Sequence, residues 1–400
     1  MLHIKASPSA KVIFVFIIMV TSMLGIFVSD IYVPSLPSIS EDFGTGAHLL
    51  AFSVTYYFIV FACAQLIYGP LSERFGRRKI FLTGLGISII GTLITVFSLN
   101  FSMLMIGRTF EAVGMAAPMS LGRVILRDVI PDKVKYARFM SFMGIGTLMA
   151  PVIAPIFGAF LAHVYHWRAD FIFILVLSLI CYIGAYVYLV ETLLNPKKRL
   201  SAKLSVKTYL WIIKNKAFIK NITISSTIMG AIIAYLSISA FLFQKYFGLS
   251  EIHYAIVFGI GEVFIAVGMF ANGMALKHIS IERSQIIAVM LFLLSGILIT
   301  IQAVFFNHSL EFIMLAIIIF NFSAGVIFPT SSTLAIVAFK TRLGAVGSLY
   351  GCISMLAAGL ISGFALSLPL EPNLLIALLI LVMSLVATVI LFGINDKTYF

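Results

Sequence analysis

The chain of 400 residues is 61% hydrophobic and 13% aromatic, carries only 10% charged residues and has a mean hydropathy of +1.12. Soluble chains carry about 25% charged residues, so this composition excludes a soluble globular protein and predicts a polytopic membrane protein. The net charge of +12 does not indicate a nucleic-acid partner, because the basic residues fall in short clusters between apolar runs rather than along one soluble face.

The three cysteines, Cys63, Cys181 and Cys352, lie far apart, each within an apolar run. This spacing fits neither a disulfide framework nor a metal site, so we interpret them as packing residues. We predict no metal and no cofactor. The first apolar run, from Val12 to Val28, is not followed by a small-residue cleavage pattern, so we interpret it as an uncleaved first helix.

Apolar windows long enough to span a bilayer core of roughly 30 Å recur along the whole chain. In the first half they lie near residues 12–35, 48–70, 80–99, 102–129, 138–163 and 168–190, and in the second near 219–246, 253–276, 284–305, 311–338, 344–367 and 373–394. We therefore predict an all-α integral membrane fold with twelve transmembrane helices. It divides into a six-helix half at 1–190, a cytoplasmic central loop at 191–217 and a second six-helix half at 218–400, as in a duplicated transporter fold.

The basic residues orient the predicted helices. Of the 27 Lys and Arg, 23 fall in the termini and loops of one side, two on the other side (Arg168 and Lys245) and two within a helix (Arg108 and Arg123). Loops rich in Lys and Arg stay in the cytoplasm, so both termini are predicted to be cytoplasmic.

The segment Gly69-Pro70-Leu71-Ser72-Glu73-Arg74-Phe75-Gly76-Arg77-Arg78-Lys79 concentrates five charges in eleven residues. We predict a cytoplasmic turn in which Gly69 and Gly76 permit tight bends. Glu73 and the arginines (Arg74, Arg77 and Arg78) are expected to pair with one another or with neighbouring helix ends and to latch one conformation. The alternative is a plain orientation signal.

Ionisable groups at membrane depth mark functional sites, because an unpaired charge there is costly. At 1.5 Å per residue, Asp30 and Arg108 fall about 8 Å and about 9 Å below the outer surface, so they are expected to pair. Glu111 shares the helical face of Arg108, nearer the midplane, and Glu262 lies near the midplane in the second half. The alternatives are structural ion pairs or helix caps.

Two further patterns concern shape. Gly146, Pro151, Pro155 and Gly158 predict a kinked fifth helix that packs closely on a neighbour, either as part of the transport mechanism or as a purely structural kink. Methionines, aromatic residues and polar residues at membrane depth suit a cavity for varied lipophilic molecules. The candidates are Met23, Tyr57, Met115, Tyr235, Glu262, Asn321 and Tyr350.

Several of these segments resemble a known family. They are the charged turn after Gly69, the Asp30-Ile31-Tyr32-Val33-Pro34-Ser35-Leu36-Pro37 ending, Gly107-Arg108-Thr109-Phe110-Glu111-Ala112-Val113-Gly114, Arg123-Val124-Ile125-Leu126-Arg127-Asp128 and the stretch from Gly146 to Gly158. Together they resemble twelve-helix drug:proton antiporters of the major facilitator superfamily, Bcr/CflA type. Glu73 stands where that family usually has Asp, and Glu111 where it often has Gln. The second half matches by layout only.

The resemblance implies a proton-coupled transporter of the inner membrane that exports small amphipathic organic compounds by alternating access. Its expected partners are the small-molecule cargo, protons and the lipid bilayer, with no nucleic acid, and it is expected to be a monomer. Asp30, Arg108 and Glu111 are then the proton-coupling residues, and the motif around Gly146 favours export. A carrier dedicated to one metabolite, such as a siderophore, is the alternative within transporters. A membrane-embedded enzyme or a channel is the alternative outside them. Against an enzyme, the histidines lack catalytic or metal-ligand spacing and the phosphate-loop motif is absent.

Overall fold

The computed structural model describes residues 8–130, 133–193, 209–306, 308–339 and 343–394. Regular secondary structure in these ranges is helical. The chain divides into two compact units, each described here by itself. Unit 1 comprises Met1–Thr45 and Val60–Leu200, and unit 2 comprises Gly46–Ile59 and Ser201–Phe400.

Unit 1 begins with a long helix, a short helical corner and further long helices. Its elements are α1 (Pro8–Asp30), η1 (Val33–Ser35), α2 (Leu36–Asp42), most of α3 (Ala47–Phe75), α4 (Arg77–Val96), α5 (Phe101–Val129), α6 (Lys133–Tyr165) and α7 (Arg168–Tyr188). Within this unit α1 packs on α5, α6 and α7, while α4 packs on α5 and α7.

The first helix ends earlier than the sequence predicted, at Asp30 rather than near Ser35. The chain then turns into η1 and α2, which carry Pro34 and Pro37 in their first turns. Proline lacks a backbone N–H and suits the first turn of a new helix, so each of the two prolines favours the start of a new helical segment. Asp30 is therefore the last residue of α1 rather than a mid-helix residue.

The charged segment from Gly69 to Lys79, which was predicted as a turn, is helical over most of its length. Helix α3 continues through Gly69 and Pro70 to Phe75, and α4 begins at Arg77. Only Gly76 breaks the helical path, with φ at +94°, a backbone conformation that favours glycine. Good helix formers follow Pro70, and a proline near a helix end removes few backbone hydrogen bonds.

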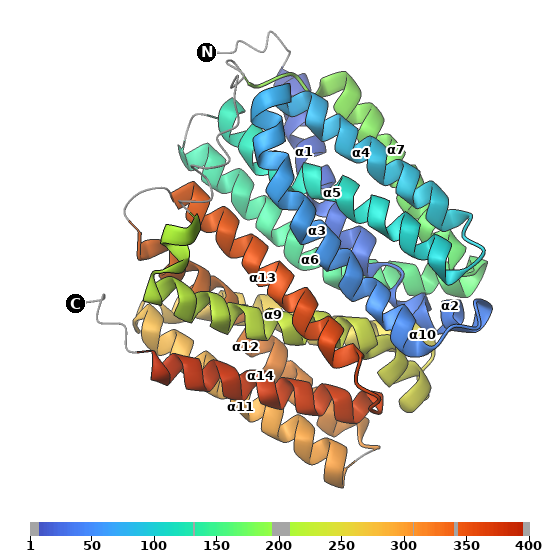
Figure 1. Ribbon diagram of the computed structural model, residues 1–400, viewed down its shortest axis with the longest axis vertical. Helices are drawn as coiled ribbons and strands as arrows, with labels where there is room; N and C mark the ends of the chain where they lie inside the picture. Colours follow the sequence, from blue (N-terminus) through green and yellow to red (C-terminus); the bar gives the residue numbers. More distant parts are fainter. Residues whose placement is uncertain (1–7, 131–132, 194–208, 307, 340–342, 395–400) are drawn as a thin grey trace. The chain divides into compact units, whose positions relative to one another are not determined.

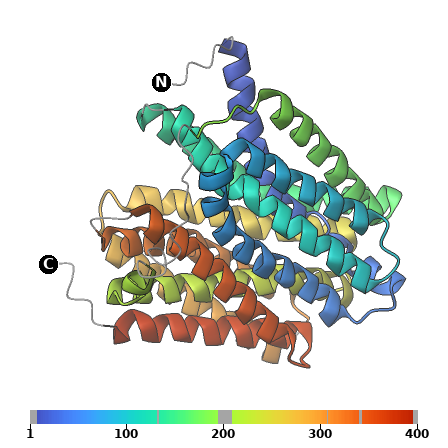
Figure 2. The same ribbon diagram turned by 45° about the horizontal axis from the view of Figure 1, so that its top comes forward.

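Helices α4 and α5 lie side by side in both views of the ribbon (Figure 1, Figure 2). A Cβ atom on Gly91 would stand 2.5 Å from the backbone nitrogen of Glu111 and 2.7 Å from the carbonyl oxygen of Gly107. Gly84 and Gly114 face each other in the same way. Small residues at these positions let the two backbones approach closely, as in membrane helix pairs.

Unit 2 is also a helical bundle. Its elements are the first part of α3, α9 (Lys216–Ala240), the π-helical η2 (Phe241–Tyr246), α10 (Glu251–Ala275), α11 (Ile281–Phe305), α12 (Leu310–Val337), α13 (Leu343–Leu366) and α14 (Pro372–Gly393). The start of α3 joins this unit through Thr55, whose hydroxyl lies 3.0 Å from that of Ser237 and 2.6 Å from that of Ser362. The division into halves at residues 190 and 218 stays a prediction, and the units differ from it in the placement of residues 46–59.

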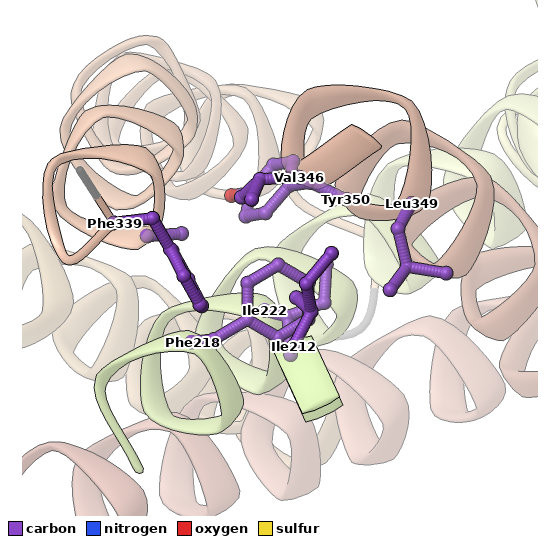
Figure 3. Packing of buried hydrophobic residues seen from close by; sticks show 8 residues of the cluster. Ile212, Phe218, Ile222, Phe339, Val346, Leu349 and Tyr350 are labelled. Atoms are coloured by element: carbon purple, nitrogen blue, oxygen red, sulfur yellow. The ribbon is translucent and has the colours of Figure 1, made fainter. Parts of the chain in front are cut away.

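One end of unit 2 is closed by an aromatic and aliphatic cluster (Figure 3). The ring of Phe218 lies edge-on to the rings of Phe339 and Tyr350, at centroid distances of 6.1 Å and 6.3 Å. Ile212, from a short helical segment at residues 209–213, packs into the same cluster. This cluster fixes the beginnings of α9 and α13 against the end of α12.

Ten helices in the described ranges are long and apolar enough to cross a membrane. The other two long helices are α5, which carries charged residues inside it, and α6, whose described apolar part runs over Met149–Tyr165. The twelve predicted segments thus correspond to the twelve long helices, and the all-α membrane fold is confirmed. Most of the predicted central loop, residues 194–208, lies outside the described residues.

Candidate functional site

A buried charged cluster lies in unit 1, where α5 packs against α1 and α4. Arg108 and Glu111 have no exposed side-chain surface, and Arg108 Nη1 lies 2.7 Å from Glu111 Oε2. The same nitrogen donates to the carbonyl oxygen of Val28, at 3.1 Å, and the guanidinium lies 4.4 Å from the ring centroid of Tyr32. Glu111 is also near the hydroxyls of α4 residues Thr92 and Thr95. The cluster thus combines an ion pair, a carbonyl oxygen and an aromatic face.

Asp30 stands at the edge of this cluster, on the last turn of α1. Its side chain is buried and accepts a 2.5 Å hydrogen bond from the Ser29 hydroxyl. Arg108 is close enough to interact with it electrostatically. The sequence predicted that Asp30 and Arg108 pair, and this stays a prediction. The structure joins Arg108 to Glu111 in an ion pair at 2.7 Å. Glu111 lies three residues after Arg108 and therefore shares its helical face. Asp30, at the end of α1, accepts its hydrogen bond from the adjacent Ser29.

Close contacts hold α1 beside this cluster. A Cβ on Gly146 of α6 would overlap the end of the Met23 side chain, and a Cβ on Gly158 would overlap the backbone carbonyl of Ile31. Both glycines therefore allow α6 to approach α1, as predicted for that helix. Pro151 and Pro155 lie within α6 between them. The fully buried Met115 of α5 packs against α1 at Gly25.

A second charged network surrounds the break at Gly76. The Glu191 carboxylate, which follows α7, accepts hydrogen bonds from the backbone N–H groups of Arg77 at 2.9 Å and Arg78 at 3.1 Å. It therefore caps the beginning of α4, where a negative charge is favourable. Arg77 Nε pairs with Asp128 at the end of α5, at 3.0 Å, and Asp128 accepts from the Thr192 hydroxyl.

This network joins the ends of α4, α5 and α7. The Arg78 side chain completes it by donating to the Tyr186 carbonyl oxygen of α7 at 2.7 Å. The arginines thus contact neighbouring helix ends, one of the two arrangements that the sequence predicted. Glu73 is half-buried in the last turns of α3, and Arg74 is exposed, its guanidinium 5.0 Å from the ring centroid of Phe75.

Three of the predicted cavity residues lie together in unit 2. Tyr235 of α9 and Glu262 of α10 interact electrostatically, and Asn321 of α12 lies against α10 at Gly261, where a Cβ would stand 3.2 Å from Asn321 Nδ2. All three side chains are buried. Tyr235 stacks on Phe258 at a centroid distance of 5.5 Å.

Two other predicted cavity residues lie elsewhere. Tyr350 belongs to the cluster around Phe218, near the opposite end of α9 from Tyr235, about 25 Å away along the helix at 1.5 Å per residue. Tyr57 is buried in α3 and lies edge-on to its neighbour Phe58.

Sequence reasoning missed the partners of the arginines. Tyr32 faces Arg108, while Asp128 and Glu191 hold Arg77 and the start of α4. Tyr32 and Asp128 stood in the motifs, but the roles of all three residues depend on contacts between helices distant in sequence.

The fold is that of a polytopic membrane protein with a charged cluster buried among its helices, and comparison with known proteins identifies its family. Residues 15–362 match the model of the Major Facilitator Superfamily, and the chain belongs to that family. This confirms the family expected from the motifs.

The relatives agree with that assignment. Multidrug resistance protein D of Escherichia coli (strain K12) is 25% identical over 348 residues, 86% of each chain. A bicyclomycin resistance protein homolog of Haemophilus influenzae is 25% identical over 296 residues, 73% of each chain. An uncharacterized MFS-type transporter of Bacillus subtilis, YdgK, is 27% identical over 369 residues, 90% of each chain. The motif-based assignment to the drug:proton antiporter group fits these relatives.

Solved structures show the same fold. A POT family transporter in complex with 5-aminolevulinic acid superimposes with a TM-score of 0.79 at 15% identity, covering 98% of both chains. A D-xylose-proton symporter gives a TM-score of 0.76 at 14% identity, covering 96% of this chain and 99% of its own. At such identities the likeness concerns the fold alone.

Proposed function

We propose that this protein is a proton-coupled exporter of small amphipathic organic compounds, working by alternating access in the inner membrane with both termini in the cytoplasm. The relatives named for multidrug and bicyclomycin resistance support export of such compounds. The observation that carries proton coupling is the buried cluster of one guanidinium and two carboxylates, Arg108, Glu111 and Asp30.

The charge of this cluster explains how it binds a proton. With both carboxylates ionised, the cluster has a net charge of −1, and with one of them protonated it is neutral. A buried site without water favours the neutral cluster, whereas a site open to water tolerates the charged one. Exposure to each side of the membrane in turn therefore loads and releases one proton.

The hydrogen bonds of the two carboxylates support different roles for them in this proposal. Glu111 holds Arg108 at 2.7 Å, and Asp30 is held at 2.5 Å by the neutral hydroxyl of Ser29. Asp30 is thus the carboxyl that can accept a proton without breaking the ion pair. When Asp30 is ionised, Arg108 can turn toward it, and because Asp30 ends α1, that movement is transmitted to α1 and to α6 behind it.

The network around Gly76 supports a conformational role. It joins three helix ends by charged hydrogen bonds and a capping carboxylate, so it acts as a clamp on the cytoplasmic side of unit 1 rather than as a cargo site. Removing one partner of a partly buried ion pair costs up to about 3 to 5 kcal/mol. This is enough to shift a balanced conformational equilibrium strongly.

The test uses inside-out vesicles with an imposed pH gradient, in which uptake of a fluorescent lipophilic compound and proton flux are recorded together. Asp30→Asn should abolish gradient-driven uptake, and the double variant Asp30→Asn with Glu111→Gln should also abolish the proton flux that the compound evokes. Glu282→Gln, the same chemical change at the start of α11, should behave as wild type. Proton-coupled uptake at the normal rate in the double variant would reject the proposal.

A further inference from the structure

We infer that Glu262, Tyr235 and Asn321 form a binding site for the cationic group of a lipophilic organic cation, inside unit 2. This inference rests on the proposed function for the statement that the bound molecule is a transported cargo. The site itself is argued from the side chains of α9, α10 and α12.

The first argument is the state of the polar atoms beside Glu262. The Tyr235 hydroxyl and both amide atoms of Asn321 are buried and have no hydrogen-bond partner among the described residues. Buried polar groups in folded proteins are nearly always hydrogen-bonded, because leaving them unsatisfied costs free energy. Here the Tyr235 hydroxyl interacts electrostatically with a buried carboxylate, and the Asn321 amide lies against Gly261, the residue before it, which indicates a site for a polar ligand group.

The second argument is the sign of the charge. Lys and Arg in the described helices of unit 2 stand at or near helix ends: Lys216, Lys220, Lys245 and Arg283. Glu262 lies eleven residues inside α10, about 16 Å from its start at Glu251. Unlike unit 1, which places Arg108 beside its buried carboxylates, the helices of unit 2 that the structure describes have no Lys or Arg at the depth of Glu262. A carboxylate at such a depth selects a positively charged partner.

The third argument is the aromatic wall. Tyr254, Phe258 and Glu262 lie four residues apart and share one face of α10. Phe258 stacks on Tyr235, and Phe320 meets the Tyr235 ring edge-on at 6.3 Å. Aromatic faces attract organic cations and also accommodate their apolar parts. A carboxylate, unsatisfied hydrogen-bonding atoms and aromatic rings together match a lipophilic cation better than a sugar or an anion.

The test measures binding to the purified full-length protein in detergent with two probes, the cation ethidium and the neutral compound chloramphenicol. Glu262→Gln should weaken ethidium binding about tenfold or more and leave chloramphenicol binding unchanged. Tyr235→Phe should weaken ethidium binding by a smaller factor. Glu262→Asp, which keeps the charge, should retain more ethidium binding than Glu262→Gln. Glu311→Gln, an exposed position at the start of α12, is the matched control.

Unchanged ethidium binding in Glu262→Gln would overturn the inference, as would equal loss of both probes in a variant that melts at the wild-type temperature. If Glu262→Gln does not fold, ethidium binding by Glu262→Asp and Tyr235→Phe is compared with that by wild type, and wild-type binding in both variants would overturn the inference. Binding in detergent needs no proton gradient. Absence of gradient-driven uptake in wild-type vesicles would therefore reject the proposed function. The binding site would still be tested independently by ethidium binding in detergent.

Discussion

Replacing Gly76 by alanine tests whether Glu191 really fastens the start of α4. The new Cβ would stand 2.5 Å from Glu191 Oε2 and 3.2 Å from its Cδ, so the carboxylate must move away from the backbone N–H groups of Arg77 and Arg78. The backbone at Gly76, with φ at +94° and ψ at 146°, belongs to a region that is essentially restricted to glycine.

Two costs add up in this variant. The backbone strain amounts to about 1 to 3 kcal/mol, and loss of a helix cap to about 0.5 to 2 kcal/mol. The expected destabilisation of unit 1 is therefore about 1.5 to 5 kcal/mol. For a domain of this size each kcal/mol lowers the melting temperature by about 2 to 4 °C, so the purified protein should melt at least about 3 °C lower.

Gly69→Ala provides the matched control in a thermal-unfolding measurement in detergent. Gly69 lies inside α3, and a Cβ there meets no atom within 4 Å, so alanine should not lower the melting temperature. Equal melting temperatures for Gly76→Ala and wild type, or equal losses in Gly76→Ala and Gly69→Ala, would refute the assignment of Glu191 as a cap held in place by the bare Gly76 backbone.

The remaining predictions concern α6 and membrane orientation. Gly158→Ala should destabilise the protein by about 1 to 3 kcal/mol, because the new Cβ meets the backbone of Ile31. Gly146→Ala should destabilise it less, because the new Cβ meets only the flexible end of Met23. Thermal unfolding of the two variants checks this order. Lys79→Cys, at an exposed position and in a background without native cysteines, should react with a membrane-impermeant maleimide only after intact cells are permeabilised, and labelling of intact cells would contradict the cytoplasmic assignment.

Much of the fold followed from the sequence because hydropathy sets where helices can cross a bilayer. The spacing of Arg108 and Glu111 likewise placed both on one face of α5, and the structure joins them. The Asp30–Arg108 pair stays a prediction: the two groups interact electrostatically, while the ion pair at 2.7 Å joins Arg108 to Glu111, and matching depths do not reveal which of two carboxylates takes the shared cation. The turn around Gly76 was placed correctly but drawn too long, since charge and proline suggested a loop where α3 remains helical.

The contacts that could not be predicted join residues distant in sequence. Glu191 reaches the start of α4 across more than a hundred residues, and nothing local to either segment indicates the pairing. In unit 2, the polar residues Glu262 and Asn321 were chosen by type and depth alone. Their common location depends on how α10 packs against α12, which is set by side chains along both helices.

The close backbone contact between α4 and α5 has a consequence for biogenesis. Helix α5 is not apolar enough to count among the ten candidate spans, since it carries Arg108 and Glu111 inside it. An arginine at the centre of a membrane segment costs about 2.5 to 3.5 kcal/mol during insertion by the translocon. The apolar α4, joined to α5 by a short connection and matched to it at Gly91 and Gly107, can offset that cost if the two enter the bilayer as one hairpin. The glycines that bring these helices together would then matter before folding is complete, when a nascent chain must retain a charged helix in lipid.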